Sequence, residues 1–377
     1  NILYRRPAMY LIKQGSAPNQ AHIDVPKGLS EEEHGRDGFR GPASHLYRRH
    51  PPTGWVRIEG PLRPRAFNCT ALSAPDRESA DAKPVEILRS ADVDVFASRR
   101  NATMPYFVRN ADGDELYFMH AGRGQFETDY GLLPYEPGTY VLLPKGTTYR
   151  IHVEIAPSFF LIAETPVSIE LPDRGMLGQH ALFDLGVIGT PTLDAGPDSR
   201  QDSREWEVRI KRAGAYTSVV YPFYPMDVVG WKGNLWPATL NVRDFRPVMS
   251  ARYHLPPSVH TTFQAGGALF STFAPRPLES DPRSIRVPFY HRNMDYDEVL
   301  FYHCGNFFSR AGIRPGMMTV HPQGIHHGPQ PQAVETGDAK TATDEVAIMI
   351  ESRSPFMVLP ELDTVEAKDY ADSWRQP

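Results

Sequence analysis

Residues 288–305, PFYHRNMDYDEVLFYHCG, repeat an earlier segment of the chain, and this repeat decides the fold. The earlier segment, residues 105–122 (PYFVRNADGDELYFMHAG), aligns with it without a gap, and nine of the eighteen positions are identical. A second pair of segments continues the match, because residues 137–151 (PGTYVLLPKGTTYRI) align with residues 315–329 (PGMMTVHPQGIHHGP). We therefore expect a duplicated domain.

Short β-rich runs lie between abundant proline and glycine residues. The 36 prolines are about twice the ordinary share of roughly 5%, and 29 glycines accompany them, so long helices should be scarce. The expected strands cover residues 115–120, 139–143, 150–155, 159–162, 218–221, 299–303, 317–321 and 346–350. Many short strands between turns are typical of β-sandwiches and barrels. Applied to a duplicated unit, this pattern predicts an all-β double barrel with few short helices.

The composition argues for a small-molecule partner. The net charge is −5, with 40 basic and 45 acidic residues, which gives no electrostatic case for binding nucleic acid or an anionic membrane. No run of eighteen apolar residues occurs, so we expect no membrane-spanning segment. Cys69 and Cys304 lie far apart and do not form a disulfide framework. A reducing, cytoplasmic location is the expectation.

The two copies differ at the residues that can bind a metal. The aligned pairs are Val108 with His291, Glu115 with Glu298, and Tyr149 with His327. Only the second copy therefore combines two imidazoles with a carboxylate. One working metal site and one retired site explain this difference better than chance does.

The set His291, Glu298 and His327 predicts a metal centre. Turns after the strands that hold these residues allow the three side chains to converge inside one barrel. Two histidines and one carboxylate leave three coordination positions open, as in non-haem Fe(II) enzymes that activate dioxygen. Mn(II) fits the ligands nearly as well, whereas a zinc hydrolase usually presents such ligands from an HExxH helix, which is absent here. His326 is an alternative to its neighbour His327, and ordinary structural histidines are the simplest alternative to a metal.

The chain resembles the cupin superfamily, and in particular homogentisate 1,2-dioxygenase. The resemblance rests on the pattern G-x5-P-x-G-x2-H that ends at His327, on the stretches PFYHRN and HHGP, and on the duplication. Residues 228–237 (VVGWKGNLWP) and the segment YHLPPS around His254 add to it. About two-thirds of the chain takes part. The resemblance implies a bicupin with a metal-free N-terminal barrel in residues 1–245 and a metal-binding barrel in residues 246–377.

The resemblance also implies the function and the roles of further residues. It implies ring opening of homogentisate or a related 1,4-dihydroxylated aromatic by Fe(II) and O2, in an extradiol-type reaction, and a homo-oligomer (trimer or hexamer). His254 would be the catalytic base and His321 would hold a substrate- or oxygen-derived atom. The residues expected to contact the substrate are Asn293, Tyr290 and Phe307.

Some residues depart from the pattern of the family. The family places its glutamate six residues after the first histidine, where this chain has Asp297, but the repeat favours Glu298. A tyrosine of the family's active site corresponds to Phe307, which puts homogentisate itself in doubt. The alternatives are a ring-cleaving dioxygenase for another hydroquinone, gentisate-like or aminophenol substrate, and a non-catalytic bicupin that binds a ligand. The polar opening to about residue 65 is expected to form arms, and the tail from residue 362 is assigned no chemistry.

Overall fold

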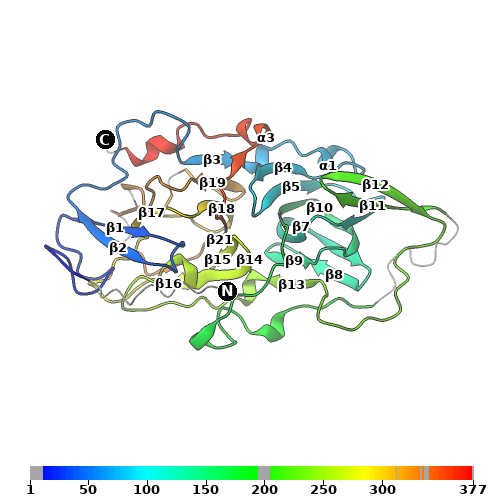
Figure 1. The fold of residues 1–377 in the computed structure, drawn as a ribbon, viewed down its shortest axis with the longest axis horizontal. Helices are drawn as coiled ribbons and strands as arrows, with labels where there is room; N and C mark the ends of the chain where they lie inside the picture. The colour runs from blue at the N-terminus through cyan, green and yellow to red at the C-terminus, as the bar shows by residue number, and fades with distance from the viewer. Residues whose placement is uncertain (1–11, 194–203, 311, 332, 335–338, 376–377) are drawn as a thin grey trace.

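The computed structural model describes residues 12–193, 204–310, 312–331, 333–334 and 339–375. Strands dominate this part of the chain, and the helices α1 (Pro75–Glu78) and α3 (Pro360–Asp363) span four residues each. Figure 1 shows two β-barrels side by side along the long axis of the molecule. The predicted all-β bicupin fold is confirmed.

The first repeat forms the barrel on the right of Figure 1. Its strands are β5 (Asp94–Arg100), β6 (Phe107–Asn110), β7 (Asp114–Thr128), β8 (Gly131–Tyr135), β9 (Thr139–Leu143) and β10 (Thr148–Thr165). β10 pairs with β5, β6 and β7, and β7 pairs with β8 and β9. β11 (Trp206–Arg212) and β12 (Ala215–Tyr221) extend the sheet beyond β6, and β13 (Ala238–Asn241) pairs with β9.

The second repeat forms the other barrel. A six-stranded sheet has the order β14 (Thr261–Ala265), β15 (Ala268–Phe273), β21 (Val346–Ser352), β18 (Asp297–Cys304), β19 (Met317–His321) and β3 (Arg65–Asn68). β17 (Tyr290–Asn293) belongs to a separate three-stranded sheet with β1 (Ser30–Gly35) and β2 (Ala43–Arg48). The strands predicted at residues 139–143 and 317–321 have the predicted bounds, because a Pro-Gly turn precedes each and a Pro-x-Gly turn follows it.

Equivalent residues of the two repeats pair in the same register. Tyr149 pairs with Val108 in the first barrel, and their counterparts His327 and His291 form an isolated antiparallel bridge in the second. Glu298 pairs with His321, as Glu115 pairs with Leu143. The duplication read from the sequence is therefore present in the strand pairing.

One hydrophobic core joins the barrels. Val299 and Phe301 of β18 alternate with Glu298, so they point away from the interior of the second barrel and toward the first. The ring of Phe301 lies 5.9 Å from that of Phe159 and 6.5 Å from that of Phe118. Burial of one such side chain stabilises the fold by about 1.5–3 kcal/mol.

Strands cross between the two halves in both directions. β3, from the polar N-terminal region, pairs with β19 of the second barrel, and β1 runs parallel to β17. In the other direction, β22 (Met357–Val358) pairs with β4 (Val85–Arg89) at the edge of the first barrel. The predicted division between residues 245 and 246 stays a prediction. Two strands of the predicted first domain, β1 and β3, pair with strands of the second barrel, and β2 pairs with β1.

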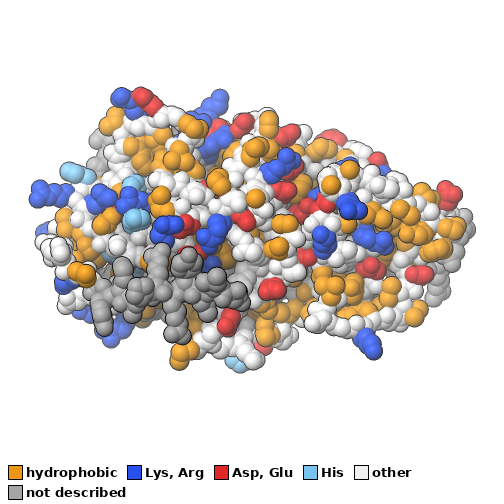
Figure 2. Space-filling model, in the orientation of Figure 1, with side chains coloured by type: hydrophobic (Ala, Val, Ile, Leu, Met, Phe, Trp, Pro, Cys, Tyr) orange, Lys and Arg blue, Asp and Glu red, His pale blue; other side chains and the backbone are white. Residues whose placement is uncertain are grey.

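The surface mixes charges of both signs. Figure 2 shows acidic and basic side chains interspersed over one face, with arginine, lysine and histidine frequent at the left end, where β1 and β2 lie in Figure 1. In the described part of the chain, no helix has both the length and the apolar character that crossing a membrane requires.

Candidate metal centre

His291, Glu298 and His327 meet inside the second barrel. His291 lies on β17, Glu298 is the second residue of β18, and His327 follows the turn after β19. The backbone bridge between residues 291 and 327 holds the two histidines opposite each other, with N–H···O distances of 2.9 and 3.0 Å. One ligand atom from each of the three buried side chains lies within 4.8 Å of the others. The structure therefore brings together the three residues that the repeat comparison selected.

The backbone orients both imidazoles toward Glu298. Nδ1 of His291 lies 3.0 Å from the carbonyl oxygen of Phe289, and Nδ1 of His327 lies 3.4 Å from that of Ile325. These contacts favour the tautomer with the proton on Nδ1, which leaves the lone pair on Nε2 for a metal. Both Nε2 atoms face the carboxylate, at 3.5 Å from Oε1 for His291 and 2.7 Å from Oε2 for His327.

The three side chains fit a divalent metal ion. Nε2 of His291 is buried and has no hydrogen-bond partner, which is costly unless another ligand satisfies it. Burial opposes the ionisation of Glu298, but His327, His291 and His321 lower its pKa well below the ordinary value. The site thus offers an anionic oxygen and two neutral imidazole nitrogens, a donor set that suits Fe, Mn or Zn.

The neighbours of the predicted ligands point elsewhere. Asp297, which lies at the spacing of the family's glutamate, accepts hydrogen bonds from the backbone N–H groups of Gln323 and Phe356, both at 2.8 Å. Nε2 of His326 lies 2.9 Å from Oε1 of Glu32 on β1. Neighbouring residues on extended backbone point in opposite directions. Glu298 therefore faces the cluster while Asp297 does not, and His327 faces it while His326 does not.

His321 lies directly behind His327. The two rings are stacked with centroids 4.6 Å apart, and Nδ1 of His321 is 3.7 Å from Oε2 of Glu298. Its Nε2 lies 3.0 Å from the hydroxyl of Tyr370, and burial, which dominates, lowers the pKa of His321 to about 3. His321 is therefore neutral at physiological pH and lies beside the carboxylate of Glu298.

His254 contacts the Phe289 ring, which also contacts His291. The Phe289 centroid is 6.0 Å from that of His254 and 5.6 Å from that of His291. Nδ1 of His254 is 2.9 Å from Oε1 of Glu279, so the carboxylate holds the Nδ1 proton and leaves Nε2 as the basic atom. This is the arrangement that a catalytic base needs.

The three residues expected to contact the substrate have structural partners. The amide oxygen of Asn293 accepts from the backbone N–H groups of Asp295 and Tyr296, both at 3.1 Å, while its buried Nδ2 has no partner. Tyr290 alternates with His291 and packs against Gly328. Phe307 packs on Tyr302, with ring centroids 4.8 Å apart. Their contacts with a substrate stay predictions.

Two residues near the cluster were missed by the sequence analysis. Glu351 on β21 pairs with Glu298, and burial, followed by the charge of Glu298, raises its pKa. Its counterpart Glu164 pairs with Glu115 in the same way. In both copies the glutamate follows an apolar run and precedes a hydroxyl residue, so the repeat could have identified this pair. Tyr370, in the tail that was assigned no chemistry, left no comparable signal.

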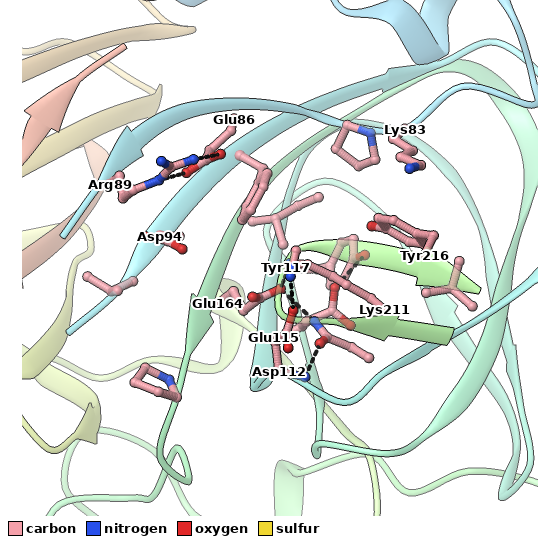
Figure 3. Close-up of a pocket in the computed structure, with 18 of the residues that line it drawn as sticks. Lys83, Glu86, Arg89, Asp94, Asp112, Glu115, Tyr117, Glu164, Lys211 and Tyr216 are labelled. Atoms are coloured by element: carbon pink, nitrogen blue, oxygen red, sulfur yellow. Dashed lines mark hydrogen bonds and ion pairs between the residues drawn. The ribbon is translucent and has the colours of Figure 1, made fainter. Parts of the chain in front are cut away.

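The first barrel has a cavity where the second has the three candidate metal ligands. Its volume is about 680 Å³, and it is lined by Val108, Glu115 and Tyr149, the equivalents of the three ligands. The Tyr149 hydroxyl donates to Oε1 of Glu115 at 3.1 Å, and Figure 3 shows Glu115 close to Tyr117 and Glu164. Burial, followed by the charge of Glu164, raises the pKa of Glu115 to about 7. These positions supply one carboxyl group and no imidazole, so they do not repeat the donor set of the second barrel.

Two family models together match most of the chain. Residues 82–242 match the family model for the N-terminal domain of homogentisate 1,2-dioxygenase, and residues 245–376 match that for the C-terminal domain. A provisionally named dioxygenase of Saccharolobus solfataricus is 31% identical, over 96% of this chain and 98% of its own length. Homogentisate 1,2-dioxygenase of Nitrobacter hamburgensis is 28% identical over 71% of this chain, and the match spans 62% of that relative. Among solved structures, a cupin 2 conserved barrel domain protein from Leptotrichia buccalis shows 11% identity and a TM-score of 0.35, over 79% of this chain and 99% of that one.

Proposed function

Because the chain belongs to the homogentisate 1,2-dioxygenase family, we propose that it is a non-haem Fe(II) dioxygenase that opens an aromatic ring with O2. Its proposed substrate is homogentisate or a closely related 1,4-dihydroxylated aromatic, cleaved in an extradiol-type reaction. The observation that carries this proposal is the convergence of two Nε2 atoms and one carboxylate at a buried point. Such a set leaves coordination positions for both substrate and O2.

His291, Glu298 and His327 would hold the iron. Ferrous iron supplies the one-electron chemistry that dioxygen needs to react with an aromatic ring. The protein contributes a fixed geometry, since the carbonyl oxygens of Phe289 and Ile325 orient the two imidazoles before any metal binds.

His254 would accept a proton from a ring hydroxyl of the substrate. Its Nε2 is the free nitrogen, because Glu279 binds Nδ1, and the carboxylate stabilises the imidazolium that forms. Removal of the proton makes the ring a better electron donor. Behind the ligands, His321 would hold a substrate- or oxygen-derived atom through Nδ1, which is buried and has no hydrogen-bond partner. This atom lies 3.7 Å from Oε2 of Glu298.

The choice among related aromatic substrates depends on Phe307. The family's tyrosine is replaced by Phe307, which cannot donate a hydrogen bond to a substrate group. A gentisate-like, hydroquinone or aminophenol substrate is therefore the second candidate. The homo-oligomer and the cytoplasmic location stay predictions from the resemblance.

Oxygen uptake across a small panel of substrates tests the proposal. The purified chain is loaded with Fe(II) without oxygen and then mixed with O2 and homogentisate, gentisate, hydroquinone or 2-aminophenol, and the ring-opened product is identified by mass. We expect one member of the panel to be cleaved with uptake of about one O2 per ring. His327→Ala should lose both iron and activity, whereas His326→Ala is the matched control because that side chain binds Glu32. No uptake with any substrate, or full activity of His327→Ala, would refute the proposal.

A further inference from the structure

We propose that a second divalent metal ion, zinc by its donor chemistry, binds between His22, Glu31 and His45, in the N-terminal region beside the catalytic barrel. These residues belong to the polar opening of the chain. Glu31 lies on β1 and His45 on β2, and His22 precedes this hairpin. Together the three residues form the hairpin site. It shares no residue with the centre formed by His291, Glu298 and His327.

The three side chains converge as metal ligands do. One ligand atom from each lies within 4.8 Å of the others. Oε1 of Glu31 is 3.0 Å from Nδ1 of His45 and 3.4 Å from Nδ1 of His22. Four ligands at about 2.0–2.1 Å around a tetrahedral zinc ion lie roughly 3.4 Å from one another. The observed separations need little rearrangement to accept an ion.

Two buried nitrogen atoms at this point have no hydrogen bond. Nδ1 of His22 and Nδ1 of His45 are both inaccessible to solvent and unsatisfied, and His22 as a whole is only 5% exposed. Buried polar atoms normally have partners, so two unsatisfied nitrogen atoms that face one carboxylate indicate a missing ligand.

The charge of the cluster also favours a cation. Glu31 and Glu33 are both buried, and among the ion pairs of the described residues neither has a lysine or arginine partner. By contrast, Glu32, on the opposite face of β1, pairs with Arg48 and Arg292. When both imidazoles are neutral, as metal ligation requires, the two carboxylates leave a buried negative charge that a divalent ion would neutralise.

The surrounding groups hold the ligands in place. Nε2 of His45 faces Oε2 of Glu33 at 3.8 Å, in the manner of the carboxylates that orient metal-binding histidines. The Tyr47 hydroxyl and the backbone N–H of His22 donate to Glu31. These bonds use part of the acceptor capacity of the carboxylate and fix its direction, and lone pairs remain for a metal.

An ion at this point would fasten the hairpin to the catalytic strand. The ring of His22 stacks on Phe289, with centroids 4.3 Å apart and an angle of 20° between the rings. Phe289 binds Nδ1 of His291 through its carbonyl oxygen, and Glu33 pairs with His291 in the β1–β17 register. The bound ion would therefore stabilise the position of Phe289, whose ring contacts both His254 and the proposed catalytic ligand His291. Two nitrogen donors with carboxylate oxygen suit zinc, which accepts a four-coordinate site of this kind.

Metal content of the full-length chain tests the proposal. After equilibration with Zn²⁺ and removal of free metal, we expect about two ions per wild-type chain. His327→Ala should lose one, His45→Ala should lose the other, and the double variant should lose both. The affinity of the hairpin site should fall by more than the 10- to 100-fold that is typical when an outer partner of a metal site is removed. His34→Ala, a histidine of the same strand on the opposite face, is the matched control and should keep both ions.

The His327→Ala protein separates this proposal from the proposed function. With the catalytic centre disabled, it should still bind one Zn²⁺ or Co²⁺, and the Co²⁺ form should show the visible absorption of a four-coordinate nitrogen and oxygen site. That measurement also decides the question if His45→Ala fails to fold. A His327→Ala chain that binds no ion, or a folded His45→Ala chain with wild-type zinc content, would overturn the hairpin site, and protons would then account for the His–Glu contacts. Oxygen uptake tests the ring-cleaving activity independently.

Discussion

Nδ1 of His120 and Nδ1 of His303 lie 3.0 Å apart at the contact between the two barrels. They are the same position of the two repeats, so the duplicated residue pairs with its own copy. Burial lowers the pKa of both histidines to about 4, with the charge of His303 adding to the effect on His120. Both rings are therefore neutral near pH 7, and an Nδ1–H of one ring can donate a hydrogen bond to Nδ1 of the other.

This pair should make the fold sensitive to acid. Between pH 6.5 and about 4 the unfolded chain binds protons that the folded pair excludes, so the free energy of unfolding should fall as the pH falls through this window. The effect is on the order of 3 kcal/mol for each histidine. Urea unfolding at several pH values should show a weaker pH dependence for the double variant His120→Gln/His303→Gln. Equal slopes in the variant and the wild type would contradict this account.

Glu298 and Asp297 should separate metal binding from stability. Glu298→Gln removes the anionic ligand and should abolish most metal binding while the chain stays folded. Asp297→Asn replaces one of the two carboxylate oxygens that accept from backbone N–H groups, so it should keep the metal and lower the free energy of unfolding by about 1–3 kcal/mol. Metal analysis and urea unfolding of both variants check this. If Asp297→Asn loses the metal and Glu298→Gln keeps it, the ligand has been assigned to the wrong residue.

The buried carboxyl group of the first barrel should give the opposite pH dependence. The pKa of Glu115 is about 7 in the folded chain, so the folded state holds a proton that the unfolded state releases near pH 4.5. Stability should therefore fall as the pH rises from about 4.5 to 7, by up to about 3 kcal/mol. Glu115→Gln should be more stable than the wild type above pH 7 and nearly equal to it at pH 4.5. Thermal unfolding at both pH values checks this, and a variant that is less stable at pH 8 would argue against it.

Tyr370 should act on the site through His321. Tyr370→Phe leaves Nε2 of the fully buried His321 without its 3.0 Å partner, which should cost about 1–3 kcal/mol of stability. Because His321 contacts Glu298, we expect a lower kcat with little change in bound metal. Steady-state oxygen uptake with parallel metal analysis separates these effects. An unchanged kcat would mean that the tail only completes the packing.

His254 and Glu279 should differ in the size of their effects. His254→Ala removes the proposed base, so oxygen uptake should fall by about 100-fold or more. Glu279→Gln keeps an acceptor for Nδ1 but removes the charge, so the loss should be smaller and the rate should depend on pH differently. Both variants should bind metal as the wild type does. A wild-type rate for His254→Ala would exclude it as the base.

The repeat made the second barrel predictable. Because the segments align without gaps, comparison of the copies selected the three candidate ligands and favoured Glu298 over Asp297, and the structure brings Glu298 into the cluster. The bounds of β9 and β19 could be predicted because a Pro-Gly turn precedes each strand and a Pro-x-Gly turn follows it. The residues that would contact the substrate were harder to predict. The amide oxygen of Asn293 caps a turn, as that of Asn110 does in the first repeat, so its presence in both copies has a structural explanation.

The contacts that the N-terminal and C-terminal segments make with the second barrel could not be predicted from the sequence. β1 pairs with β17 from about 260 residues away, and its sequence SEEEHG has no apolar alternation because its glutamates are buried by ion pairs and imidazoles. Likewise Tyr370 reaches His321 through a short 3-10 turn with no periodic signal. Local sequence patterns predict a strand from the alternation of its apolar residues. These two segments could not be predicted in that way, because polar partners far away in the sequence hold them in place.

The exchange of β3 and β22 links the two halves of the chain through paired strands. Each barrel borrows an edge strand from the far end of the chain. A gene cut between the repeats would therefore yield two polypeptides with open, unpaired sheet edges, and such edges are prone to aggregate. Each half therefore has a structural role in the other, whether or not it binds a metal, because it depends on a strand from the opposite end of the chain.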